Sequence, residues 1–96
     1  MKAIRIKVHE PMYRDDGVIQ QAVYRLEPAL DFSEYVLVSA STVLGTPETF
    51  IFACESDGEV TDWRELEGSY CGGMDHEHAL RGAGYTDIEY GEVGNV

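Results

Sequence analysis

The sequence is short of positive charge. It has seven Lys and Arg residues against eighteen Asp and Glu residues, for a formal net charge of -11 and an isoelectric point near 4.4. The shortage is uneven: residues 1–25 hold five bases and three acids (net +2), whereas residues 26–96 hold two bases and fifteen acids (net -13). A field of this sign disfavours nucleic acid, nucleotide-like polyanions and anionic membranes as direct ligands. It favours a basic protein partner, or a surface that simply stays well solvated.

Cysteine and long apolar runs are also scarce. The two cysteines, Cys54 and Cys71, do not make a disulfide framework in a chain that has enough apolar residues for a core. The longest apolar runs, residues 35–38 and 50–54, fall far below the roughly 20 residues of a membrane span. The N-terminal segment alternates charged and apolar residues, unlike a signal peptide. We therefore expect a cytoplasmic protein with reduced thiols and no membrane association.

The residues that are present suffice for one hydrophobic core, since 44% of them are hydrophobic and 10% are aromatic. Alternation with a period of two predicts a strand over residues 2–9, with Ile4, Ile6 and Val8 on its inner face. Residues 22–27 fit a helical stripe or a strand, and their β-branched and aromatic composition favours a strand.

The clearest pattern is a β-hairpin. Residues 35–43 and 48–54 are rich in β-branched and aromatic side chains, and Gly45 and Pro47 interrupt them, which is typical of two antiparallel strands joined by a short turn. Both faces of the first strand carry apolar residues. We therefore expect central strands that are covered on both sides for part of their length.

The last third of the chain has helix signals. An Asp followed three residues later by Glu predicts one short helical turn over residues 62–66. Asp75 is typical of an N-cap for a helix over residues 76–83, and Gly84 is typical of the position just after such a helix. Alternation predicts a closing strand over residues 86–90.

These elements predict an α+β fold. We expect a single acidic domain over residues 1–96, with a mostly antiparallel sheet of four to five strands and one short helix near the C-terminus. Trp63, Leu66 and the helix are expected to cover the sheet face that carries Phe50 and Phe52.

The densest group of reactive side chains consists of Cys71, His76 and His78. Joined by Cys54 or His9, they could supply metal ligands, or Cys71 could be a nucleophile with histidines nearby. On a helix, however, His76 and His78 point ~200° apart and do not share an ion. The paired spacing of a zinc site and the signatures of cysteine enzymes are both missing from the sequence. We predict no metal, no cofactor and no catalytic residue, and keep a small Cys/His metal or thiol protein as an alternative.

Trp63 is the only tryptophan and lies between Asp62 and Arg64 in a polar stretch. Its size favours a place in the core. The alternative is an exposed anchor for a partner, ringed by acids. The acids that we predict to bind a partner together with Trp63 form three groups: Asp57, Glu59 and Asp62; Glu65, Glu67 and Glu77; and Asp87 and Glu89.

We predict a non-enzymatic binding protein whose carboxylates occupy a basic groove on another protein, one that normally holds nucleic acid. Asp87 and Glu89 would lie ~6.7 Å apart on one face of a strand, as a row of phosphate-like charges. The short, acidic build without a catalytic signature is similar to that of small phage and mobile-element proteins that inhibit host proteins such as defence nuclease complexes. This likeness covers no specific residue. The remaining alternative is a structural or assembly module that self-associates through a sheet edge or an apolar patch.

Overall fold

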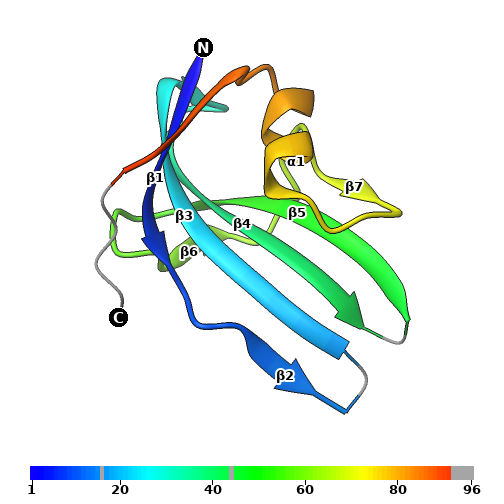
Figure 1. Cartoon of the computed structure of the whole chain (residues 1–96). Coiled ribbons are helices and arrows are strands. Elements are labelled where there is room, and N and C mark those ends of the chain that lie inside the picture. The colour runs from blue at the N-terminus through cyan, green and yellow to red at the C-terminus, as the bar shows by residue number, and fades with distance from the viewer. Residues whose placement is uncertain (16, 44, 92–96) are drawn as a thin grey trace.

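The computed structural model describes residues 1–15, 17–43 and 45–91 (Figure 1). In chain order the elements are β1 (Lys2–Val8), β2 (Met12–Arg14), β3 (Gly17–Leu30), β4 (Ser33–Val43), β5 (Thr46–Cys54), β6 (Val60–Asp62), β7 (Tyr70–Cys71), α1 (His76–Gly82) and β8 (Asp87–Tyr90). Among the described residues, no helix is long and apolar enough to cross a membrane.

The strands of the described residues form one curved sheet (Figure 1). Its order is β6-β5-β4-β3-β1-β8, with β2 paired to β3 and β7 paired to β5. Neighbours run antiparallel except β1 and β8, which are parallel. The prediction of a mostly antiparallel sheet with one short helix is confirmed, but eight strands replace the predicted four to five. The extra strands β2, β6 and β7 are two or three residues long, too short for alternation to be recognised in a sequence.

Local capping interactions position α1 as predicted. The Asp75 Oδ1 atom accepts a hydrogen bond from the His78 backbone N–H at 3.2 Å, and Asp75 is the N-cap of the helix. The predicted helical turn over residues 62–66 is wrong. Asp62 ends β6, and its Oδ1 atom accepts the Arg64 backbone N–H at 2.9 Å, so this side chain closes a turn instead of capping a helix.

The larger core cluster lies between the sheet and α1. The helix contributes Ala79 and Leu80, which are both fully buried, and it contacts β4 and β5. Residues of this cluster from the sheet and the adjoining loops are Ala3, Ala22, Tyr24, Leu26, Val36, Val38, Ile51, Leu66 and Tyr85.

The predicted cover of the Phe50 and Phe52 face is wrong in part. Ile51 is the β5 residue that packs with Leu66 and the helix, so its neighbours Phe50 and Phe52 point to the opposite face. Trp63 does contact that face, with its ring 5.1 Å from that of Phe52. Because both faces of β5 carry apolar residues, alternation alone did not show which face the helix covers.

A β-bulge changes the facing of β1. The pairing of β1 with β3 shifts between Arg5 and Lys7. Ala3 is fully buried, whereas Ile6 and Val8, which were predicted to point inward, are exposed. The strand itself is confirmed. The predicted inner face is wrong, because Ala3 pairs with Leu26 of the helix-side cluster whereas Ile4 pairs with Arg25, and the bulge then places Val8 opposite Ala22 of that cluster.

Candidate functional site

The residues predicted to bind a partner are spread over several elements. Asp57 and Glu59 lie in the β5–β6 turn, Asp62 ends β6, Trp63, Glu65 and Glu67 follow it, Glu77 lies on α1, and Asp87 and Glu89 lie on β8. Strands β6 and β8 are the two ends of the strand order. The predicted residues therefore do not form one continuous surface. The largest subset that is continuous in the chain is the segment from Asp62 to Glu67, which holds Asp62, Trp63, Glu65 and Glu67.

This segment lies against the β3–β4 turn. The Arg64 guanidinium pairs with Asp31 of that turn and lies 4.0 Å from Asp62. The two segments line a shallow pocket of about 380 Å³. We call the outer side chains of both segments the Trp63 surface, which consists of Asp31, Phe32, Asp62, Trp63, Arg64, Glu65 and Glu67.

Leu66 anchors the segment from Asp62 to Glu67 to the hydrophobic core. Leu66 is buried against the helix-side cluster, and its backbone N–H donates to the Ile51 carbonyl at 2.8 Å. Its neighbours Glu65 and Glu67 are exposed. The single inward residue thus fixes the loop on β5 and leaves the flanking carboxylates in solvent.

Trp63 is exposed over 69% of its surface, so the prediction that it fills the core is wrong. Only one edge of the indole packs, against Phe52. Phe32 is exposed over 102% of its reference surface and lies next to Asp31, the ion-pair partner of Arg64. Sequence reasoning missed Phe32, because the tight turn that exposes it was not recognised between β3 and β4.

Residues 26–96 hold only two bases, Arg64 and Arg81, against fifteen acids. Both bases pair with acids of the same segment, Arg64 with Asp31 and Arg81 with Glu77 at 3.5 Å. On β8, Glu89 pairs with Lys2 at 3.0 Å. All of these pairs are solvent-exposed and contribute little to stability. Glu65 and Glu67 on the Trp63 surface are exposed, and no ion pair holds either carboxylate among the residues that the structure describes.

The structure separates the reactive residues of positions 71–78. Cys71 is exposed at the end of β7, and the His78 ring lies 4.5 Å from the Tyr70 ring. His76 instead points into a different pocket. Within the described part of the chain, no three His, Cys, Asp or Glu side chains are placed to hold a metal ion.

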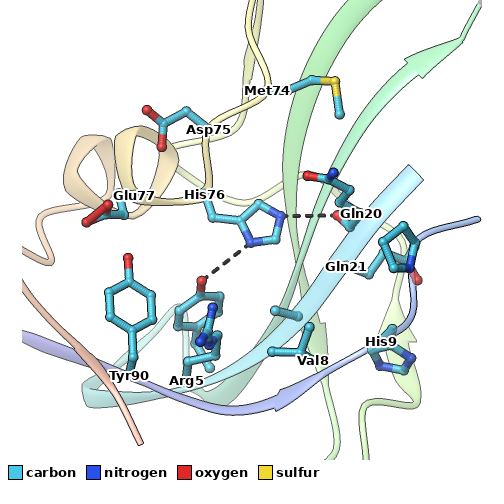
Figure 2. A pocket seen from close by; sticks show the side chains of 13 residues that line it. Arg5, Val8, His9, Gln20, Gln21, Met74, Asp75, His76, Glu77 and Tyr90 are labelled. Carbon is cyan, nitrogen blue, oxygen red and sulfur yellow. Dashed lines mark hydrogen bonds between the residues drawn. The ribbon is translucent and has the colours of Figure 1, made fainter. Parts of the chain in front are cut away.

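A second pocket, of about 330 Å³, lies between β1, β3 and the start of α1 (Figure 2). The His76 ring spans it. Its Nε2–H donates to the Gln20 carbonyl at 3.1 Å, and its Nδ1 lies 3.4 Å from the Tyr24 hydroxyl. A carbonyl can only accept, so Nε2 carries the proton and Nδ1 is the acceptor for Tyr24. Both ring nitrogens are therefore engaged by the protein itself.

Burial sets the protonation of this pair. It lowers the pKa of His76 and raises the pKa of Tyr24, so both side chains are neutral near pH 7. At the rim, the Arg5 guanidinium lies 4.5 Å from the centre of the Tyr90 ring. Figure 2 shows Glu77 and Tyr90 on one side of His76 and His9 on the other. These contacts hold the His76 ring between β3 and the start of α1.

Comparison with known proteins found no match to a family model, a curated protein or a solved structure.

Proposed function

We propose that this chain is a non-enzymatic binding protein that recognises a basic surface on another protein through the Trp63 surface. The observation that carries this proposal is the position of Trp63: a tryptophan exposed over 69% of its surface, among carboxylates, in a chain with a net charge of -11. Burying an indole is one of the largest gains a single side chain offers, and tryptophan is enriched among residues that dominate binding energy.

Charge complementarity supports a basic partner. The Trp63 surface holds four acids, Asp31, Asp62, Glu65 and Glu67, and one base, for a net charge of -3. A second copy of the chain would bring the same negative charge against it, which disfavours self-association through this surface. A basic partner would be steered toward it and would neutralise it.

The basic surface that we propose is one that ordinarily holds nucleic acid, so the protein would act as an inhibitor. Of the other predicted acids, Asp57 and Glu59 in the β5–β6 turn would extend the negative field beyond the Trp63 surface, whereas Glu77 lies on α1, and Asp87 and Glu89 lie on β8 at the other end of the strand order. A groove that binds nucleic acid is lined by Lys and Arg side chains that pair with phosphates. Carboxylates on the Trp63 surface could take the place of those phosphates. The inhibitor would then be displaced by DNA or RNA that fits the same groove.

The test is affinity capture from a lysate of the natural host, with the wild-type chain and matched variants immobilised at equal density. Trp63→Ala and the double variant Glu65→Gln/Glu67→Gln remove the proposed contacts. Glu10→Gln/Asp15→Asn removes the same charge from exposed positions in the N-terminal part and serves as the control.

We expect one basic protein to be retained at ~0.05 M salt and lost at ~0.5 M, because the Debye length falls from ~14 to ~4 Å. The Trp63 and Glu65/Glu67 variants should lose it, the control should keep it, and a DNA oligonucleotide should elute it. Binding that is flat with salt and equal for all variants would eliminate the proposal.

A further inference from the structure

The β3–β4 turn has an unusual residue at its tip. Leu30 pairs with Ser33, so the loop consists of two residues, Asp31 and Phe32. Both have positive φ angles, 50° and 67°. This is the backbone of a two-residue hairpin turn of the I′ type, in which both central residues are left-handed and Asn, Asp or Gly are preferred. Asp31 suits such a turn, and Phe32 stands where glycine is usual.

The Phe32 side chain does not pack against the rest of the fold, so no packing contact offsets the strain of this conformation. A bulky residue in the left-handed region is a true outlier, because its Cβ crowds the backbone. Strain of this kind is compensated in most proteins by packing of the side chain, but the Phe32 ring is fully exposed. Strained, over-determined residues cluster where a protein binds something. Phe32 is therefore an exposed aromatic side chain in a strained turn that packing within this chain does not account for.

Phe32 and Trp63 flank one ion pair. Asp31, the neighbour of Phe32, pairs with Arg64, the neighbour of Trp63. The surface thus offers two exposed aromatic side chains, each next in sequence to one member of this ion pair, together with the exposed carboxylates of Glu65 and Glu67. Within the same chain a guanidinium already lies over an aromatic ring, that of Arg5 over Tyr90 at 4.5 Å.

We propose that Phe32 and Trp63 together make the partner-binding surface selective for arginine over lysine side chains. This rests on the proposed function and names the partner chemistry that it recognises. A guanidinium is planar, so it can stack on an aromatic face while its edge pairs with a carboxylate such as Glu65 or Glu67. The ammonium of lysine is a compact, strongly hydrated point charge and cannot do both equally well.

The experiment uses two defined probes, the acetylated and amidated peptides (Gly-Arg)₄ and (Gly-Lys)₄, which carry equal charge. Because Trp63 is the only tryptophan, its fluorescence reports binding at the surface directly. Each peptide is titrated at ~0.05 M salt into wild type and into three variants. Phe32→Gly removes the ring and suits the turn, Phe32→Asn is a second variant that tolerates a left-handed backbone, and Tyr13→Ala removes an exposed aromatic from β2 as the control.

We expect wild type to bind the arginine peptide about two- to five-fold more tightly than the lysine peptide, the range of one exposed cation–π contact. Both Phe32 variants should lose this preference while lysine-peptide binding stays unchanged, and Tyr13→Ala should behave as wild type. Phe32→Gly should also raise the urea midpoint of unfolding, because it relieves the strain.

The two proposals fail differently. If neither peptide alters Trp63 fluorescence, the proposed function is wrong. If both bind equally and the Phe32 variants are silent, the surface binds basic ligands but the arginine inference is overturned. A lower urea midpoint for both Phe32→Gly and Phe32→Asn would show that the ring supports the fold, and would equally overturn it.

Discussion

Adjacent residues of β5 offer a sharp test of which sheet face forms the main core. Ile51 is fully buried between the sheet and α1, whereas Phe52 is half-buried on the opposite face against Trp63. Ile51→Ala removes three carbon groups, worth about 2.4 kcal/mol at ~0.8 kcal/mol each, and leaves a cavity. We expect a total loss of about 3–4 kcal/mol. The Ile51 backbone hydrogen bonds to Leu66 and Ser69 do not depend on the side chain.

Phe52→Ala should be milder despite its larger side chain. A fully buried phenylalanine costs about 3–5 kcal/mol on truncation, so roughly half of that, about 2 kcal/mol, is expected for a half-buried ring. The assay is urea unfolding followed by far-ultraviolet circular dichroism, with Ile51→Val as a graded control at about 1 kcal/mol. In a domain of 96 residues, 1 kcal/mol corresponds to roughly 4–8 °C in Tm. Phe52→Ala costing as much as Ile51→Ala would refute the assignment of the faces.

Three further perturbations test the loop, the buried histidine and the thiols. Gly68 has a φ of 100°, and a Cβ there would lie 2.3 Å from the Ala79 carbonyl oxygen. Gly68→Ala should therefore lower the free energy of unfolding, measured by urea titration, by more than about 2 kcal/mol. A loss below about 0.5 kcal/mol would contradict this close approach. Burial lowers the pKa of His76 from 6.5, so the unfolded chain binds more protons below that pH and stability is lost as the pH falls from about 6.5 through the folded pKa. Unfolding titrations from pH 8 to 5 should therefore show a shallower pH dependence for His76→Gln than for wild type, and equal slopes would count against the neutral histidine. Cys71 is exposed, whereas Cys54 is buried and its pKa is raised to about 11 by that burial. A disulfide reagent should therefore modify Cys71 rapidly and Cys54 slowly. Cys71→Ser should abolish that fast phase without altering fold or binding, and lost binding or a lost metal would instead restore a chemical role for Cys71.

Local interactions are what the sequence by itself determined. The long strands around residues 35–54 follow from β-branched and aromatic runs broken at Gly45, and β4 and β5 pair there as predicted. The helix begins where Asp75 caps it. These features depend on residues a few positions apart, whose propensities act before any tertiary contact forms. The charge excess was likewise a property of composition alone.

Tertiary structure decided which surface each side chain meets. In β1 it is Ala3, and not Ile4, that shares a face with the helix-side cluster, and the bulge between Arg5 and Lys7 then shifts the alternation, which no local signal marks. His76 contacts Tyr24, 52 positions earlier in the chain, only because α1 packs against the sheet. Such contacts depend on register and on the face of the sheet that the helix covers.

The proposed binding surface is also a feature that tertiary structure decided. The sequence placed acids around Trp63 but favoured burying the indole, because burial of so large a side chain is usually favourable. Trp63 stays exposed because Leu66 is the residue of the same loop that packs into the core, against the face of β5 that the helix covers. The β3–β4 turn, which carries Phe32, is joined to this loop by the pair of Asp31 with Arg64, residues 33 positions apart. Charge could be counted from the sequence, whereas the contact between the Trp63 loop and the β3–β4 turn exists only in the folded chain, because its two ion-pair partners lie far apart in the sequence.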